Sequence, residues 1–371
     1  MKLHLVELRR ARLPLVTPFR TALGTERTRE VLLVRVESDA GEGWGECVAS
    51  SDPSYSSEYL DSAWLTLERY LVPVLLEAKD LKATAVQPLL SRSKGHRMAK
   101  AALEMAILDA QLRSTGESLK TFLGGVTDSV TAGVAVGITS STEELIESVR
   151  QYIDAGYRRV KLKIEPGWDL QPVQAVRDRF GNGLMLQVDA NGTYRRSDFD
   201  HLGQLDQFSL LLIEQPLDEE DLVGHAQLAR RIATPVCLDE SIVSANGAAA
   251  AIALGACSIV NIKPGRVGGL LEARSVHDLC VSSAVPVWCG GMLETGIGRA
   301  ANLALASLPG FTLPGDISAS DRYFSEDITP PFVLDDGRIA VPTGAGLGVE
   351  VLLPVLDRLT TKIETIKSPD S

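Results

Sequence analysis

Four charged residues stand at the ends of four short apolar runs, and their spacing along the chain is nearly constant. They are Asp189, Glu214, Asp239 and Lys263, separated by steps of 25, 25 and 24 residues. Apolar runs of this length, each followed by a helical stretch, are typical of parallel strands that alternate with helices. Because parallel strands end at one edge, the spacing predicts that these four side chains meet in a single site.

The three acids of this set point to metal chemistry. Three carboxylates that converge in a poorly solvated mouth repel one another, and a divalent cation removes that penalty. An all-oxygen set without His or Cys favours Mg²⁺ over Zn²⁺. Any one acid alone could equally cap a strand end or form a loop ion pair, but the shared period favours metal binding by Asp189, Glu214 and Asp239 together. Mn²⁺ or another divalent cation could substitute.

A fifth apolar run, residues 159–165, precedes the others and carries two lysines. Lys161 and Lys163 are two positions apart, so both side chains point to one face of a strand. Lys263 ends the sixth predicted strand, nearly opposite the second in a ring of eight. We therefore expect Lys163 and Lys263 to flank a metal-bound ligand. Mg²⁺, Lys161 and burial all disfavour the ammonium form of Lys163 and favour its use as a base.

For two neighbouring residues, Glu240 and Arg266, the sequence leaves more than one role open. Glu240 alternates to the opposite face from Asp239, so we expect it behind the metal ligands or in a structural role. Arg266, three residues beyond Lys263, is either a solvated loop arginine or a side chain that acts on the lysine from behind.

The elements that must position these residues form one repeating pattern. Eight strands alternate with about seven helices over roughly 190 residues, which fits a closed α/β barrel. An open doubly wound sheet would not bring five consecutive strand ends round one centre. We predict a (β/α)7β barrel over residues 126–319 and an α+β capping domain over residues 1–125, to which residues 320–371 return. The strands are expected to start near residues 130, 159, 184, 210, 235, 258, 285 and 311.

Local patterns predict several elements more closely. Residues 31–49 form a hairpin signature, and residues 331–342 form another with its turn at Asp336–Gly337. Residues 98–112 have helical periodicity and end at Gly116. Residues 140–156 form a helix in which Ser140 or Ser141 is the N-cap and Gly156 the terminator.

Composition excludes several classes of protein. The chain has 371 residues, 45% of them hydrophobic, and a net charge of -11, which argues against nucleic-acid binding. No apolar run reaches the roughly 18 residues of a membrane span, and the N-terminus alternates in a way unlike a signal peptide. Five scattered cysteines without a C-x-x-C pair indicate reduced thiols and a cytoplasmic protein.

The motifs resemble those of the enolase superfamily and its muconate-lactonizing subgroup, in which a lysine base works with Mg²⁺. They are K-x-K (161–163), DANGTY (189–194), IEQP (213–216), LDES (238–241) and NIKPGRVGG (261–269). The stretch WCGGMLETGIGRAANLALASLPG (288–310), followed by PGDISASDRYF (314–324), resembles the o-succinylbenzoate synthase / N-succinylamino acid racemase family.

This resemblance implies further features of the site. Capping loops, here 17–25 and 50–55, would close over the barrel mouth, and the metal would bind a substrate carboxylate. Asn191, Gly291 and Met292 would line the substrate pocket. The protein would be a homo-oligomer, a dimer or an octamer. Position 135 is Ala where family members often carry Ser, which bears on substrate preference and not on mechanism.

The predicted function is removal of a proton α to a carboxylate, on a small carboxylate substrate. The reaction is dehydration to o-succinylbenzoate in menaquinone biosynthesis, racemisation of N-succinyl or other N-acyl amino acids, or both. A dipeptide epimerase or a muconate cycloisomerase is the alternative. Dipeptide epimerases typically carry D-x-D on the last barrel strand, where this chain has PGDISAS, and muconate cycloisomerases lack SASDRYF.

Two other classes of protein compete with this prediction. A nicotinamide-dependent oxidoreductase has the support of Gly296-x-Gly298-x-x-Ala301 alone, without the acid expected about 20 residues later. A catalytically silent binding or structural protein on the same scaffold would be expected to lack a metal carboxylate or a lysine, and both sets are complete.

Overall fold

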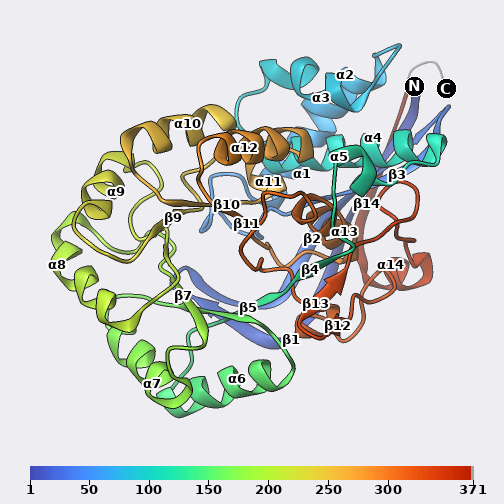
Figure 1. Ribbon diagram of the computed structural model, residues 1–371. Coiled ribbons are helices and arrows are strands. Elements are labelled where there is room, and N and C mark those ends of the chain that lie inside the picture. The colour runs from blue at the N-terminus through green and yellow to red at the C-terminus, as the bar shows by residue number, and fades with distance from the viewer. Residues whose placement is uncertain (369–371) are drawn as a thin grey trace.

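The computed structural model describes residues 1–368, and the chain forms two parts that lie side by side (Figure 1). One part is a parallel sheet curled into a barrel and surrounded by helices. The other is an antiparallel sheet with helices packed on one of its faces. This arrangement confirms the predicted α/β fold with a (β/α)7β barrel and a capping region.

The barrel consists of seven parallel strands in sequential order and one irregular segment that closes the ring. The strands are β5 (Gly133–Val136), β6 (Arg159–Lys163), β7 (Met185–Asp189), β8 (Ile213–Glu214), β9 (Val236–Leu238), β10 (Ile259–Ile262) and β11 (Val287–Cys289). Residues 311–316 bridge both edges, since the Asp316 N–H donates to Cys289 O (2.9 Å) and the Gly133 N–H to Gly315 O (2.8 Å). Pro314 has no N–H to donate, which explains why this predicted eighth strand is not a regular one.

Helices cover the outside of the barrel (Figure 1). They are α6 (Thr142–Asp154), α7 (Leu170–Phe180), α8 (Phe199–Leu202), α9 (Leu222–Ala229), α10 (Ala245–Leu254), α11 (Pro264–Val267), α12 (Leu270–Ser282) and α13 (Gly296–Ala306), with short helices η3 (Arg196–Asp198), η4 (Gly203–Phe208) and η5 (Ser320–Arg322). In α6 the N-cap is Ser141, whose hydroxyl accepts the Glu144 N–H at 3.2 Å. Leu145 and Val149 bury the inner face of this helix.

The capping region is built on a four-stranded antiparallel sheet with the order β14-β1-β2-β3. Its strands are β1 (Leu3–Thr21), β2 (Gly24–Ser38), β3 (Gly41–Cys47) and β14 (Thr360–Lys367). The helices are α1 (Leu60–Thr66), the π-helix η1 (Leu67–Leu71), α2 (Val72–Leu76), α3 (Ala83–Leu89), η2 (Leu90–Arg92), α4 (Arg97–Thr115) and α5 (Leu119–Leu123). A Cβ at Gly45 would lie 2.0 Å from Ala102 O, so glycine is what allows β3 to lie against α4.

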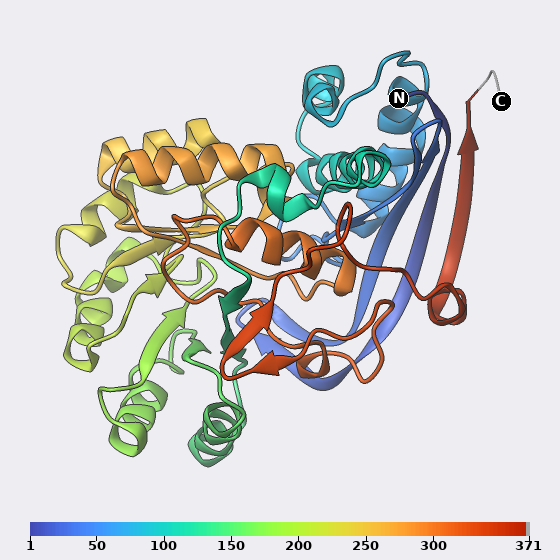
Figure 2. The same ribbon diagram turned by 45° about the vertical axis from the view of Figure 1, so that its right-hand side comes forward.

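The C-terminal part of the chain contacts both regions. The predicted hairpin is present as β12 (Leu334–Asp335) and β13 (Arg338–Ala340), and it pairs with β4 (Ser129–Thr131) beside the barrel. After α14 (Leu353–Leu359), β14 pairs with β1, so both chain termini lie at the same end of the molecule (Figure 2). None of the helices in residues 1–368 is long and apolar enough to span a membrane.

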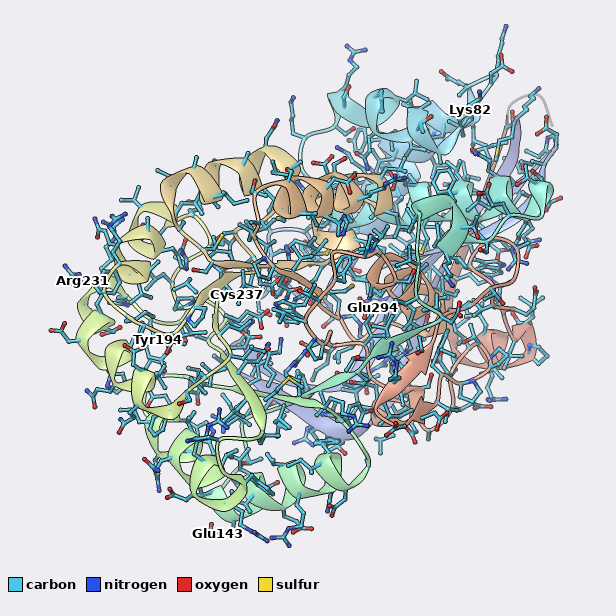
Figure 3. All side chains as sticks on the ribbon, in the orientation of Figure 1. Lys82, Glu143, Tyr194, Arg231, Cys237 and Glu294 are labelled. Atoms are coloured by element: carbon cyan, nitrogen blue, oxygen red, sulfur yellow. The ribbon has the colours of Figure 1, made fainter. Side chains whose placement is uncertain are left out.

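The barrel interior holds a small apolar cluster below the site. Leu212, Cys237, Ile259 and Trp288 form it, and Figure 3 shows Cys237 at the centre of the barrel while Glu143, in α6, lies on the outside. All five cysteines are buried and free, as the sequence predicts. The Arg159 guanidinium and the Lys161 ammonium lie over the Trp288 ring of this cluster, 5.2 and 5.0 Å from its centre.

Candidate active site

Strand β6 points three cationic side chains into the barrel, because Arg159, Lys161 and Lys163 alternate on one face. The Lys161 ammonium lies 2.9 Å from Glu214 Oε2 and 3.0 Å from Asp189 Oδ2. Lys163 donates to Asp189 Oδ2 at 2.6 Å and to Asn191 Oδ1 at 2.8 Å. The two predicted lysines of β6 thus contact two of the three predicted metal ligands.

Lys263 approaches from the opposite side of the ring. In the closed order of eight segments, β6 is the second and β10, which Lys263 follows, is the sixth. Its ammonium donates to Asp239 Oδ2 at 2.7 Å and to Tyr55 Oη at 3.2 Å. Each of the two lysines therefore pairs with a different acid, and the cavity lies between them.

Arg266 is buried, and the alternative of a solvated loop arginine is wrong. Its guanidinium donates to Ile242 O at 2.9 Å and to Asn261 O at 2.6 Å, and it forms an ion pair with Asp239. The short helix α11 begins directly after Lys263 and folds the side chain back under the site. The position of Arg266, three residues after Lys263, does not by itself predict that the chain turns back and buries the side chain.

The three predicted metal ligands are almost completely buried, with relative exposures of 1% for Asp189 and 0% for Glu214 and Asp239. Over residues 1–368, no three acid, His or Cys side chains are spaced as they would be around a metal ion. Each acid instead binds a lysine. Beside them, Glu240 Oε2 and Asn261 Oδ1 are buried without a hydrogen-bond partner in the described chain. A set of oxygen donors with unused acceptor atoms fits a hard divalent cation.

The acids and lysines shift one another's protonation strongly. Burial alone would lower the pKa of Lys161, but the charges of Asp316, Glu214 and Asp189 outweigh it and raise the pKa. Burial would likewise lower the pKa of Lys263, yet the Tyr55 hydroxyl and nearby carboxylates raise it. Burial together with the Asp189 charge raises the pKa of Glu214. The protonation of each of these groups therefore depends on the charges of the others.

Glu240 lies beside the site and not on the opposite face of the strand, but it is not among the residues that line the cavity, so its expected place behind the metal ligands stays a prediction. Its Oε1 accepts a hydrogen bond from Asn191 Nδ2 at 2.9 Å. The expectation assumed that side chains alternate along a strand as far as Glu240. This assumption does not apply, because β9 ends at Leu238. Asn191 thereby connects Glu240 to Lys163.

Two central residues were not predicted from the sequence. Asp316 accepts a hydrogen bond from Arg159 at 2.6 Å and lies 2.5 Å from the Lys161 ammonium. Arg159 is fully buried, and its guanidinium lies 5.2 Å from the centre of the Trp288 ring. The rules applied to the other site residues could have identified both. Asp316 ends the eighth segment of the barrel, and Arg159 lies on the same face of its strand as Lys161.

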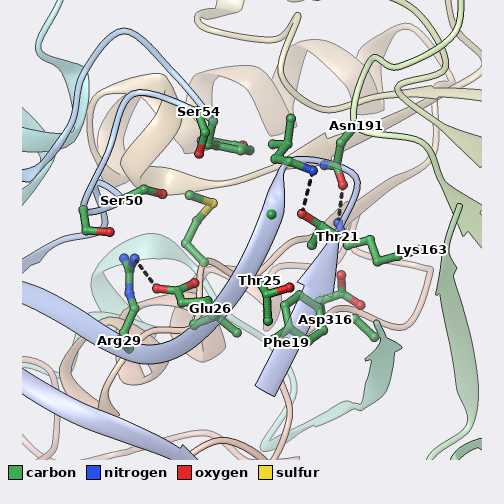
Figure 4. A pocket seen from close by; sticks show the side chains of 18 of the residues that line it. Phe19, Thr21, Thr25, Glu26, Arg29, Ser50, Ser54, Lys163, Asn191 and Asp316 are labelled. Carbon is green, nitrogen blue, oxygen red and sulfur yellow. Dashed lines mark hydrogen bonds and ion pairs between the residues drawn. The ribbon is translucent and has the colours of Figure 1, made fainter. Parts of the chain in front are cut away.

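The cavity between the lysines is lined by both regions of the chain. From the barrel come Lys161, Lys163, Asn191, Lys263, Gly291, Met292 and Asp316. From the capping region come Phe19, Thr21, Leu23, Thr25, Ser50 and Tyr55, in the two segments predicted to cover the mouth. Figure 4 shows the capping side chains facing Lys163 and Asn191 across this space. The arrangement places the amines of Lys161, Lys163 and Lys263 and the carboxylate of Asp316 around one cavity.

Comparison with known proteins agrees with this geometry. Residues 5–124 match the mandelate racemase / muconate lactonizing enzyme N-terminal domain, and residues 144–354 match the enolase C-terminal domain-like family. The chain is 62% identical over 361 residues to an N-succinylamino acid racemase of Amycolatopsis sp, covering 97% of this chain and 98% of that protein. It is 44% identical to an o-succinylbenzoate synthase of Geobacillus kaustophilus, covering 97% and 96%.

A solved structure gives the same result. A member of the enolase superfamily from Listeria innocua superimposes with a TM-score of 0.95 at 42% identity, over 99% of each chain. The two family matches together span most of the sequence, and the superposition includes both the barrel and the capping region. The chain therefore belongs to the enolase superfamily, in its mandelate racemase / muconate lactonizing enzyme branch.

Proposed function

We propose that this protein is an enzyme that removes the proton α to a substrate carboxylate, with the help of Mg²⁺. Its substrates would be N-succinyl or other N-acyl amino acids, the cyclohexadiene precursor of o-succinylbenzoate, or both. The observation that carries this proposal is that Lys163 and Lys263 enter one cavity from opposite strands of the barrel. Relatives named N-succinylamino acid racemase and o-succinylbenzoate synthase support the same choice of substrates.

Asp189, Glu214 and Asp239 would hold the cation. When bound, it would neutralise the substrate carboxylate and stabilise the negative charge that develops on its oxygens. The preference for Mg²⁺ rests on the donors, because carboxylate oxygens without His or Cys suit a hard cation. Mn²⁺ shares much of this preference.

The charge balance of the cluster favours a lysine base. Its five carboxyl groups and five cationic side chains are all buried. They are Asp189, Glu214, Asp239, Glu240 and Asp316, against Arg159, Lys161, Lys163, Lys263 and Arg266. A bound divalent cation would add two positive charges and the substrate carboxylate one negative charge, and the remaining surplus of positive charge favours loss of a proton from a lysine.

The two lysines would have distinct parts in each reaction. In racemisation, one lysine removes the α-proton and the other delivers a proton to the opposite face of the carbon. In dehydration, Lys163 removes the proton and helps to expel water, while Lys263 stabilises the charged intermediate. Both reactions use the same two positions on opposite sides of the substrate.

The position of Asp316 argues against dipeptide epimerisation. In this structure Asp316 is the acid of the last barrel segment, and it already pairs with Arg159 and Lys161. It is therefore not available to bind the α-ammonium group of a dipeptide.

Exchange of the substrate α-proton into deuterated water tests the proposal. Wild type with Mg²⁺ should racemise an N-succinyl amino acid and exchange both enantiomers. Lys163→Ala and Lys263→Ala should both abolish racemisation, while each retains some exchange of a different enantiomer. Lys82→Ala, on the surface of the capping region, is the matched control and should behave as wild type. Near-normal racemisation by either active-site variant would reject the two-base assignment.

Three further features belong to this proposal. The chain would divide into a capping domain over residues 1–125 and a barrel over residues 126–319. The enzyme would form a dimer or an octamer, which light scattering can measure. It would work in the cytoplasm, and five buried free cysteines support a reducing compartment.

A further inference from the structure

The antiparallel sheet of the capping region ends in a strand whose outer edge is open. β14 is the last strand in the order β14-β1-β2-β3, and over residues 1–368 it pairs with β1 alone. Figure 2 shows it, in red, as the outermost strand of this sheet. Its eight residues, TTKIETIK, are mostly β-branched and contain no proline. An edge of this length and composition can pair with another strand.

The side chains of β14 alternate between the two faces of the sheet. The Lys362 ammonium lies over the Trp64 ring, 4.0 Å from its centre, and Glu364 points to the same face. Ile363 points to the other face and is 49% exposed. Neither Lys362 nor Glu364 forms an ion pair with another residue in the described part of the chain. The edge thus carries one charge of each sign, two positions apart, with no opposite charge to bind.

Symmetry limits how two copies of this edge can pair. Homo-oligomers most often associate about a two-fold axis, which sets identical strands antiparallel. Direct pairs in an antiparallel ladder alternate between hydrogen-bonded and non-hydrogen-bonded kinds. If Ile363 faced Glu364, the symmetry-related pair would be the next in the ladder and therefore of the other kind, which a two-fold axis does not allow. One residue of β14 must therefore lie opposite the same residue of the second copy.

The charges select one of the remaining registers. Within Thr360–Lys367, only registers centred on Ile363 or on Glu364 pair seven residues of the eight. The Glu364 register sets two carboxylates directly opposite each other, which is destabilising. The Ile363 register sets Lys362 of each copy opposite Glu364 of the other, and the two Ile363 side chains meet at the axis. These three central residues belong to the regular ladder with β1, since the bulge in β14 comes before Lys362.

Exposed apolar side chains lie in the helices beside this edge. α2 lies against β14, and its Val74 is exposed. Tyr70, two residues before α2, is exposed as well. A specific interface needs apolar surface in addition to a strand pair, and these side chains would supply part of it.

We propose that β14 pairs with β14 of a second copy of this chain, with Ile363 at the two-fold axis and Lys362 opposite Glu364. The two four-stranded sheets then form one sheet of eight strands. This interface specifies the homo-oligomer that is part of the proposed function, and it does not depend on the proposed reaction.

Disulfide cross-linking tests the register. Directly opposite residues of an antiparallel pair have Cβ atoms about 4.5–5.5 Å apart, so Ile363→Cys should link two copies under mild oxidation. Thr365→Cys is the matched control, because it lies on the same face but about 13 Å from its counterpart, four residues along the ladder. The five natural cysteines are buried and should not react.

Charge reversal tests the pairing of Lys362 with Glu364. Glu364→Lys and Lys362→Glu each replace two opposite-charge pairs with two like-charge pairs, and each should raise the dissociation constant about tenfold or more. On dilution, light scattering should then give half the molar mass of wild type. An equimolar mixture of the two variants should regain the wild-type mass, because each mixed interface again contains two opposite-charge pairs. Asp178→Lys, on barrel helix α7, changes the net charge as Glu364→Lys does and is the control.

The outcomes separate the interface from the rest of the proposed function. A monomeric wild type would overturn both the interface and the proposed oligomer. An oligomer whose mass is unchanged by both charge reversals would overturn the interface alone, as would equal cross-linking of Ile363→Cys and Thr365→Cys. Neither measurement uses a substrate, so a protein without racemase activity could still confirm the interface.

Discussion

Glu46 joins the two parts of the molecule through a buried carboxylate. It lies on β3, yet it accepts hydrogen bonds at the start of barrel helix α13, from Thr295 N–H (3.0 Å), Thr295 Oγ1 (2.7 Å) and Gly298 N–H (2.9 Å). Burial raises the pKa of Glu46 to about 7, and the nearby charge of Glu294 acts in the same direction. The folded protein therefore binds a proton at this site more tightly than the unfolded chain does.

The sign and size of the effect follow from this pKa. A carboxyl group whose pKa is raised on folding stabilises the protein fully below its ordinary pKa, and this stability is lost as the pH rises through the folded value. The difference between the ordinary value of 4.5 and about 7 corresponds to about 3 kcal/mol, since one pKa unit is worth about 1.4 kcal/mol. The glutamine of Glu46→Gln does not titrate. Part of this energy is already lost at pH 5, so between pH 5 and pH 8 the variant should gain about 2–3 kcal/mol in unfolding free energy relative to wild type.

Urea unfolding of both proteins at pH 5, 6, 7 and 8 measures this difference. Glu42→Gln, on the same strand, is the matched control. Arg35 and Trp44 overcome the effect of burial on Glu42 and lower its pKa, so its difference from wild type should stay constant over this range. The reasoning would be refuted if the unfolding free energies of Glu46→Gln and wild type changed with pH in parallel. It would also be refuted if the unfolding free energy of wild type rose relative to that of the variant as the pH rises.

Three further predictions concern the site and the packing that supports it. Asp316→Asn leaves Arg159 and Lys161 buried without their shared acid and should cost about 3–5 kcal/mol in urea unfolding at pH 7. Because Arg159 and Lys161 overcome burial and hold the pKa of Asp316 below its ordinary value, this cost should shrink as the pH falls below about 4. Chelation of divalent metals with EDTA should stop exchange of the substrate α-proton, and added Mg²⁺ should restore it; exchange that persists after chelation would exclude metal dependence. Gly45→Ala sets a Cβ 2.0 Å from Ala102 O and should lower stability by about 1–3 kcal/mol, measured as a fall in Tm; an unchanged Tm would contradict the packing of β3 on α4.

The period of the charged residues is enough to identify most of the site. Asp189, Glu214 and Lys263 could be found because each follows an apolar run, and in a parallel barrel all strands end at one edge. Lys161 and Lys163 could be paired because strand side chains alternate. These inferences need only local periodicity and one topological rule.

The same rules failed where the backbone leaves regular structure. Alternation placed Glu240 on the wrong side because β9 ends at Leu238. Arg266 remained ambiguous because its burial depends on the short helix α11. Asp316 is a different case, because the strand-end rule applies to it but only the acids and the lysine with the 24- to 25-residue spacing were singled out.

The sequence by itself was enough to predict the fold, the three acids and the two lysines. The types of these residues and their spacing along the chain do not depend on how the side chains pack. Only the tertiary structure decided which cation binds which acid, that Arg159 and Asp316 complete the cluster, and that Arg20 of the capping region forms an ion pair with Glu165 of the barrel. These contacts join residues 145 and 157 positions apart in the chain. Such contacts depend on how the capping sheet packs against the barrel loops, and the local periodicity of the sequence does not predict that packing.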